Sequence, residues 1–358
     1  MKVLLDFHHH ALAESYALTL ADRLGWDLWF PYGMDWFDQG VWQFEKEWHG
    51  DRVARQYLEG IWTDAEKGCC TAHLRDVRHP NRYLKGVTLD AARAMGDWDI
   101  VISSLPANDV GYADFAKNHG ATFGVQVGND LQYSRWDLAE FIWSSSTLPG
   151  FGPEHIGKRF TFNGTPTVMT HQEFSLDIFR DRPPMVGNVV ASFVNCFCEG
   201  PSYPHFKAFA KRHSDEFDFR VYGSYGSCEQ DEFAAGDLSL VPDIAKAMAD
   251  ARIGWHTKHW SDGFGHTIHN WFALGRPIVG YQRYYQDKLA GVLWDEGKTA
   301  FDIERLSEAE LLDLLRRLRD DDDYYARICE QAAWRFREVV DYDAEADLVR
   351  ALIEETAS

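Results

Sequence analysis

The sequence has few cysteines, no long apolar run and far fewer basic than acidic residues. Its 358 residues include 6 cysteines, and none of them belongs to a paired C-x2-C pattern of the kind that binds zinc. In a chain of this size we interpret them as reduced thiols and expect a cytoplasmic protein. No stretch approaches transmembrane length, and the apolar run at the N-terminus is too short for a signal peptide.

Positive charge is scarce. The chain carries 36 basic and 56 acidic residues, which gives a formal net charge of -20. An acidic surface repels polyanions at long range, so this charge argues against nucleic acid or an anionic membrane as a partner. Aromatic residues are abundant instead, with 14 tryptophans, and we expect most of these to fill cores.

Strand and helix patterns alternate along the chain. Apolar strands separated by helices over residues 2–30 and 98–145 predict a parallel sheet, and a second such unit begins near residue 188. The length also exceeds that of one domain. We therefore predict an α/β fold with two Rossmann-like domains facing across a cleft. The predicted boundaries are an N-terminal domain at 1–180 with a Trp-rich, mainly helical insertion near 32–84, a C-terminal domain at 181–340, and a terminal helix at 341–358 with the option of packing back on the first domain.

Two further regions carry expectations about secondary structure. Residues 149–184 contain many glycines and prolines and no long periodic run, so we place the domain boundary in their second half. Beyond residue 281, the apolar spacing predicts helices over residues 284–293, 308–319, 324–339 and 344–355.

The most informative stretch is residues 254–281, which follows the order strand, polar loop, glycine turn, helix, strand. A loop that enters a helix in this way presents backbone N–H groups and the positive end of the helix dipole, which suit a diphosphate. An ordinary tight turn and a surface lysine are the alternatives. The residues that we expect to bind the anion are Gly263, Phe264, Gly265, His266 and Thr267 in the turn, with Lys258 as a point charge and His256 as a hydrogen-bond donor.

A second candidate site follows the first predicted strand, where His8, His9 and His10 stand in a row. Histidine titrates near neutrality, so it suits a general base or an acceptor-binding residue. Side chains alternate along an extended strand, which favours His10, then His9, and disfavours a metal triad. Asn129 and Asp130 end another strand and are candidates for the acceptor or the transferred sugar, with an Asx-capped turn as the alternative.

The glycine turn also carries a family resemblance. Residues 262–265, DGFG, followed by residues 269–279, HNWFALGRPIV, resemble the donor-site signature of retaining GT-B fold glycosyltransferases, the Glu-x7-Glu group. Asp262 and Asn270 stand in the two glutamate positions. The resemblance implies that Asp262 lies near the transferred sugar as a catalytic residue and that Asn270 holds the nucleotide ribose. The family's basic pair is not evident near residues 195–200, and we expect Arg276 to serve a surface or helix-dipole role.

The resemblance implies a glycosyltransferase of the hexosyltransferase type. It would move a sugar from a nucleoside-diphosphate sugar, a UDP- or GDP-sugar, to an acceptor hydroxyl without a further cofactor or a metal. The stereochemical course stays open, and so does the acceptor, which is a glycan, a small molecule or, less favoured, a modified nucleic-acid base. Three alternatives remain: a DNA-base glycosyltransferase, a sugar-nucleotide 2-epimerase, and a catalytically silent sugar- or nucleotide-binding protein, which the loss of both glutamates supports.

Overall fold

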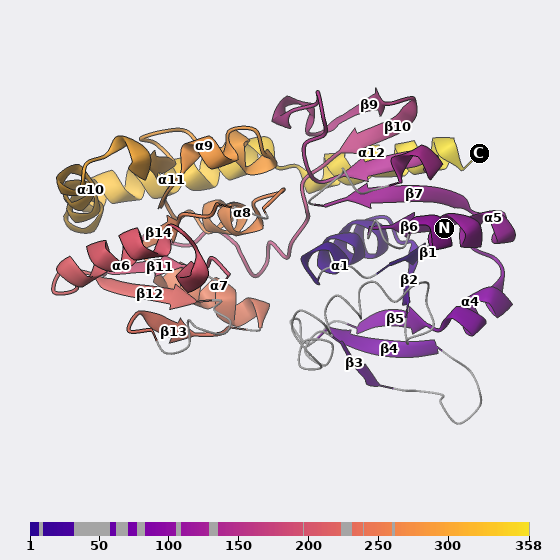
Figure 1. The fold of residues 1–358 in the computed structure, drawn as a ribbon, viewed down its shortest axis with the longest axis horizontal. Coiled ribbons are helices and arrows are strands. Elements are labelled where there is room, and N and C mark those ends of the chain that lie inside the picture. Colours follow the sequence, from indigo (N-terminus) through magenta and orange to yellow (C-terminus); the bar gives the residue numbers. More distant parts are fainter. Residues whose placement is uncertain are drawn as a thin grey trace. The chain divides into compact units, whose positions relative to one another are not determined.

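The computed structural model divides the chain into two compact units. Unit 1 combines Met1–Phe174 with Tyr342–Ser358, and unit 2 is Ser175–Asp341. The boundaries expected from the sequence lie at residues 180 and 340. Each unit contains a sheet of its own (Figure 1). The structure describes residues 1–6, 10–31, 58–61, 71–76, 83–104, 109–128, 135–195, 197–222, 231–238, 240–259 and 262–357.

The described residues of unit 1 form a sheet in the order β3-β4-β5-β2-β1-β6-β7-β8-β10-β9. Strand β1 lies between β2 and β6 and is parallel to both. Val3, Leu4 and Leu5 of β1 are fully buried, as expected for a parallel strand covered on both faces. The strands are β1 Lys2–Leu5, β2 Asp27–Pro31, β3 Leu58–Ile61, β4 Thr71–Asp76, β5 Tyr83–Val87, β6 Ile100–Ser103, β7 Thr122–Val127, β8 Phe141–Ser144, β9 Lys158–Phe162 and β10 Thr165–Met169.

The chain ends in a helix, α12, that belongs to unit 1. Val349, Leu352 and Ile353 of α12 share one apolar core with Val3 and Leu5 of β1. The C-terminal helix thus packs on the sheet formed by the N-terminal part of the chain (Figure 1). The helices that the structure describes in this unit are α1 His10–Tyr16, which continues into a π-helical segment at Ala17–Arg23, α4 Leu89–Met95, α5 Asp109–His119 and α12 Tyr342–Thr356.

Part of the predicted helical insertion at residues 32–84 is wrong. Strands β3 and β4 and the start of β5 lie in this range, with β4 antiparallel to both β3 and β5. Strand β5 pairs in turn with β2, so backbone hydrogen bonds extend the sheet outward at this edge. Backbone pairing of this kind does not depend on a periodic side-chain pattern, so the amino-acid sequence does not mark these strands. The Trp-rich residues 32–57 lie outside the described residues.

Unit 2 contains a parallel sheet, whose order in the described part of the chain is β13-β12-β11-β14-β15-β16. Strand β14 is buried throughout and lies between β11 and β15. The hydrophobic core of unit 2 is rich in aromatic side chains and includes Phe206, Phe209 and Trp255. The strands are β11 Val189–Ser192, β12 Asp218–Tyr222, β13 Ala234–Gly236, β14 Ile253–His256, β15 Ile278–Gly280 and β16 Ala300–Asp302.

The helices of unit 2 mostly lie where the apolar spacing predicts them. Ser307 and Glu310 form a capping box at the start of α10, and Asp321 caps α11. The exception is the helix predicted at 284–293, which is split into α9 and a 3₁₀ turn at Leu289–Leu293. A Cβ on Gly291 would lie 2.3 Å from the carbonyl oxygen of Tyr285, so the close approach of the 3₁₀ turn to the end of α9 requires glycine at this position. The helices are α6 Tyr203–Arg212, α7 Val241–Asp250, α8 His266–Ala273, α9 Gln282–Tyr285, α10 Glu308–Asp320 and α11 Asp322–Val339.

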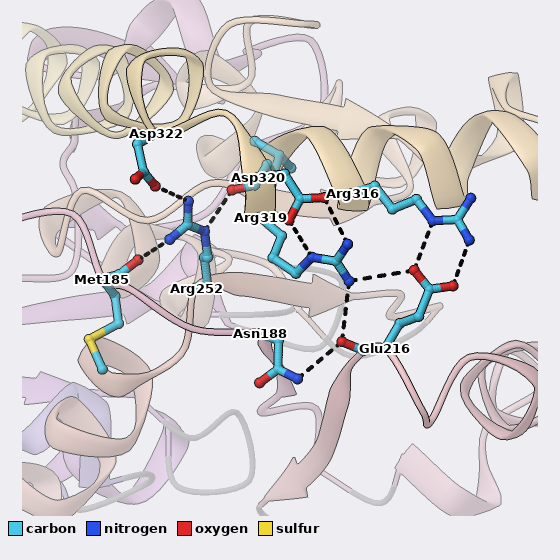
Figure 2. Close-up of polar contacts among 9 residues, drawn as sticks. Met185, Asn188, Glu216, Arg252, Arg316, Arg319, Asp320 and Asp322 are labelled. Carbon is cyan, nitrogen blue, oxygen red and sulfur yellow. Dashed lines mark hydrogen bonds and ion pairs between the residues drawn. The ribbon is translucent and has the colours of Figure 1, made fainter.

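A buried arginine fixes the N-terminal end of β14. Arg252 donates from Nη1 to the carbonyl oxygen of Met185 at 2.6 Å and from Nη2 to Asp322 at 2.9 Å (Figure 2). Nearby, Glu216 accepts two hydrogen bonds from Arg316, at 2.6 and 2.8 Å. Arg252 is only 2% exposed, so its bond to the Met185 carbonyl oxygen is shielded from water, whereas the Asp322 side chain is 80% exposed. The two bonds connect β14 to the chain before β11 and to the start of α11. The opposite end of β14 carries the candidate site.

Two observations bear on the expected cellular setting. Cys329 is a free, buried thiol, but Cys198 is disulfide-bonded to a partner outside the described residues. The expectation of reduced thiols is therefore wrong for Cys198, because spacing along the sequence does not reveal which cysteines the fold brings together. Among the helices of the described residues, none is both long and apolar enough to span a bilayer.

Candidate functional site

The glycine turn lies at the carboxyl edge of the sheet of unit 2. Strand β14 ends at His256, and α8 begins at His266, with the polar loop between them. Ligands of open parallel sheets bind at this edge. The predicted order of strand, loop, helix and strand is confirmed, since α8 occupies His266–Ala273 and β15 follows at Ile278–Gly280.

Gly265 is the N-cap of α8 and adopts a left-handed backbone conformation, with φ of 84°. A Cβ at this position would lie 2.4 Å from Cβ of Ala290, so both the conformation and the space require glycine. The carbonyl oxygen of Gly265 accepts from the backbone N–H of Ile268 and from Nδ1 of His269, at 3.0 Å each. Phe264 stacks on His269 with 3.9 Å between ring centroids. The turn is therefore rigidly packed against its own helix.

The Asp262 carboxylate lies behind this turn. Its Oδ1 accepts from the backbone N–H of Gly265 at 2.9 Å, and its Oδ2 accepts from the hydroxyl of Tyr285 at 2.8 Å. Lys258 Nζ and His256 Nε2 lie 3.7 and 3.8 Å from the same Oδ2. His256 Nε2 also lies 2.6 Å from the Tyr285 hydroxyl. The structure thus brings together His256, Lys258 and Asp262, which the sequence predicts as site residues, and adds Tyr285.

Burial and charge set the protonation states in this cluster. Burial alone would raise the pKa of Asp262, but the hydrogen-bonding His256, the Lys258 ammonium and the Tyr285 hydroxyl together bring it well below its usual range. Burial lowers the pKa of His256. Near neutral pH the cluster therefore contains an ionised carboxylate and a neutral imidazole, with the Lys258 side chain 21% exposed at its rim.

Lys288 is a second cation near this cluster. Burial lowers its pKa to about 8, against the opposing pull of the Asp262 charge. Its ammonium lies 3.5 Å from the ring centroid of Tyr284. Neither Lys288 nor Tyr285 belongs to a motif, since only the packing of the segment after β15 against the loop brings them close. No sequence pattern marks either residue.

The remaining donor-site candidates lie on α8 or beside it. Asn270 is 5% exposed, and its Oδ1 is a buried acceptor without a hydrogen-bond partner among the described residues. His266 and Thr267 occupy the first turn of α8, where backbone N–H groups face away from the helix. Lys258 and Thr257 also line a small cavity of about 10 Å³, which reaches the loop after β11 through Asn195.

Arg276 lies at the C-terminal end of α8, as one of its two expected roles requires, and donates to the carbonyl oxygens of Leu274 and Gly275 at 3.3 and 3.4 Å. It is 1% exposed and donates to the backbone carbonyl oxygens of Pro183 and Ala249, at 2.9 and 3.1 Å. The expectation of a surface position is wrong, because the guanidinium is drawn into the core by unpaired carbonyls at the ends of neighbouring segments.

Most of the candidate residues of unit 1 lie outside the described part of the chain. His10 begins α1, and nothing can be stated of its side chain. His9, Asn129 and Asp130 lie outside the described residues. The described part of unit 1 contains a buried polar cluster that the sequence does not single out: the Ser103 hydroxyl lies 2.6 Å from Asp109 Oδ1 and 3.3 Å from Asp6 Oδ2, where β1 and β6 end.

The chain was compared with known families, curated proteins and solved structures. No protein-family model and no curated protein matches the sequence. Solved structures are similar over nearly the whole chain. HepE of Anabaena in complex with UDP-glucose has a TM-score of 0.61 at 12% identity, covering 99% of this chain and 100% of that chain. Sucrose-phosphate synthase of Thermosynechococcus elongatus has a TM-score of 0.60 at 10% identity, covering 99% and 98%. The chain has the GT-B fold.

The GT-B fold expected from the resemblance is thereby confirmed, with its two Rossmann-like units. A third similar structure, TarM of S. aureus with UDP and an α-GlcNAc-glycerol, has a TM-score of 0.55 at 9% identity over 99% of this chain and 100% of that chain. Identities this low establish the GT-B fold and leave the Glu-x7-Glu signature as a resemblance of the local sequence at Asp262 and Asn270.

Proposed function

We propose that this GT-B chain is a glycosyltransferase that uses a nucleoside-diphosphate sugar as donor. The observation that carries the proposal is the Gly263–Gly265 turn, which leads into α8 at the carboxyl edge of a parallel sheet with Lys258 beside it. Backbone N–H groups and a cation in this arrangement stabilise the leaving diphosphate. Similar structures containing UDP or UDP-glucose support this choice of ligand.

The donor would be held by groups of unit 2. Within residues 263–267, the backbone N–H groups other than that of Gly265, which donates to Asp262, would bind the diphosphate together with the Lys258 ammonium. Asn270 would bind a ribose hydroxyl, because its buried Oδ1 needs a donor. An unpaired buried acceptor costs about 1–3 kcal/mol, which a ribose hydroxyl would offset. The arrangement needs no metal to neutralise the leaving group.

The acceptor would be bound by unit 1. His10, and after it His9, would serve as the general base if the reaction inverts configuration, and Asn129 and Asp130 would contact the acceptor or the transferred sugar. These residues follow parallel strands of unit 1 or, for His10, begin the helix after β1. A UDP- or GDP-sugar is the proposed donor class.

The test is a panel of UDP-, GDP-, ADP- and dTDP-sugars incubated with the full chain, followed by measurement of the released nucleoside diphosphate. Release with one donor class, increased by an acceptor sugar, supports a transferase. Rearrangement of the donor without an acceptor would indicate a 2-epimerase, and transfer only to DNA would indicate a DNA-base glycosyltransferase. Binding without turnover would indicate a silent binding protein.

A further inference from the structure

Both oxygens of the Asp262 carboxylate are occupied by groups of the protein itself. Oδ1 accepts from the backbone N–H of Gly265 and Oδ2 from the Tyr285 hydroxyl. The Asp262 side chain is only 11% exposed. The carboxylate therefore bonds to the backbone of Gly265, three residues later in the chain, and little of its surface is accessible to a ligand.

The hydrogen bonds of Tyr285 have a fixed direction. Its hydroxyl has one proton, which it donates to Asp262, so its short contact with His256 requires the imidazole to donate from Nε2. The other ring nitrogen, Nδ1, is buried and makes no hydrogen bond to the described residues. This matches a neutral ring with its proton on Nε2. His256 thus orients Tyr285, and Tyr285 orients Asp262.

The same short segment that carries Tyr285 also supports the turn from another side. The backbone N–H of Ala290 donates to the carbonyl oxygen of Phe264 at 3.1 Å. Ala290 also fills the space that a side chain at Gly265 would need. The segment from α9 to the 3₁₀ turn therefore holds the backbone of residues 264–265 in two ways. Tyr285 acts through the Asp262 carboxylate, and Ala290 acts through a direct backbone hydrogen bond.

We propose that Tyr285, together with His256, is a positioning residue that holds the Asp262 carboxylate on the backbone of Gly265. In this role Asp262 sets the geometry of the diphosphate-binding turn and does not contact the transferred sugar. The inference rests on the proposed function. Asp262 would thus support the binding of the donor's diphosphate, whereas the resemblance implies that it contacts the transferred sugar.

The two roles predict different effects on the affinity for UDP, which lacks the sugar, and for UDP-glucose, which carries it. Calorimetry with UDP and with UDP-glucose, on the full chain and on its Tyr285→Phe and Asp262→Asn variants, separates them. Tyr325→Phe is the matched control, because it also removes one hydrogen bond of a buried tyrosine hydroxyl of unit 2, to the carbonyl oxygen of Arg252 at 2.7 Å, at the opposite end of β14. The thermal unfolding midpoint of each variant, measured without ligand, shows whether weaker binding comes from a local change in the turn or from a general loss of stability.

A positioning role predicts that Tyr285→Phe weakens the binding of UDP and of UDP-glucose by the same factor, about 10- to 100-fold, as expected for one lost hydrogen bond to a charged group. Asp262→Asn should weaken the binding of both ligands equally and more strongly than Tyr285→Phe does, and Tyr325→Phe should bind both as the unmodified protein does. Unchanged UDP binding with weaker UDP-glucose binding in Asp262→Asn would overturn the inference in favour of a sugar contact. Unaltered binding in Tyr285→Phe would remove Tyr285 from the site. If the unmodified chain binds neither these ligands nor the other nucleotide sugars of the panel, the proposed function fails as well.

Discussion

Lys258 stands at the rim of the candidate site, 3.7 Å from Asp262 and partly exposed, so it is placed to meet an incoming anion. Replacing it by Ala should weaken donor binding about 10- to 100-fold, because a hydrogen bond to a charged group contributes roughly 1.5–3 kcal/mol. The measurement is the donor dissociation constant by calorimetry. Lys246→Ala on the exposed face of α7 is the control and should bind normally. An unchanged constant in Lys258→Ala would exclude this residue from the site.

A second residue-scale prediction concerns Asp109, which shares the Ser103 hydroxyl with Asp6. That hydroxyl can donate one proton only, so a protonated carboxyl can supply the other hydrogen bond. Burial raises the pKa of Asp109 from 3.8 to about 6, and the charge of Asp6 adds to this, although the N–H of Arg135 opposes it. The folded state therefore holds its proton more tightly than the unfolded state.

The sign of the pH effect follows from this difference. The stability contributed by protonated Asp109 is fully present below pH 3.8 and is lost as the pH rises through about 6, at a total of about 3 kcal/mol. Asp109→Asn keeps a neutral side chain at every pH. Its free energy of unfolding in urea should thus fall less between pH 4 and pH 7.5 than that of the unmodified protein. Parallel curves for the two proteins would show that Asp109 ionises normally.

At the scale of elements, the turn and α8 act as one packed unit around Gly265. Gly265→Ala should lower donor affinity by more than about tenfold, because it combines a left-handed backbone, which costs roughly 1–2 kcal/mol, with a 2.4 Å approach to Ala290. Gly297→Ala is the matched control: Gly297 has φ of 75° but no atom within 4 Å of the added Cβ. It should lose stability only, with normal affinity. Equal affinities in both variants would contradict the role of the turn.

The elements also show how far the sequence could predict the structure. The order β14, α8, β15 was predictable because glycines mark each boundary and the strands are continuously apolar. The antiparallel pair β9–β10 was missed inside residues 149–184, although Asn163-Gly164 between them, with φ of 48° and 90°, is a typical hairpin turn. Tyr285 and Lys288 could not be predicted at all, since they reach the site only through packing of a segment that no motif marks.

At the scale of the whole molecule, the chain returns to its first unit through α12. A buried pair holds this helix: the Glu345 carboxylate accepts from the backbone N–H and Nδ1 of His171, at 2.8 and 2.6 Å. Glu345→Ala should reduce the free energy of unfolding of unit 1 by about 3–5 kcal/mol, because it leaves buried donors unpaired. Glu355, also on α12, forms an exposed pair with Arg159 of β9, and Glu355→Ala should cost less than about 1 kcal/mol. Similar losses in urea would show that α12 is not held by the buried pair.

The division into two Rossmann-like units was predictable from length and alternation, because each parallel sheet leaves its own run of buried strands in the sequence. The chemistry was predictable only as far as the glycine turn. Asp262 illustrates the limit: its position in the signature suggests contact with a sugar, whereas its hydrogen bonds connect it to Gly265 and Tyr285. Which atoms a carboxylate meets is decided by tertiary packing.

The most direct test of the account is calorimetric titration of the full chain with the four nucleoside diphosphates UDP, GDP, ADP and dTDP. We expect the chain to bind one of them at one site per chain, and Lys258→Ala to bind it more weakly. A chain that binds none of the four, while remaining folded by its thermal midpoint, would contradict the assignment of the Gly263–Gly265 turn as a diphosphate site.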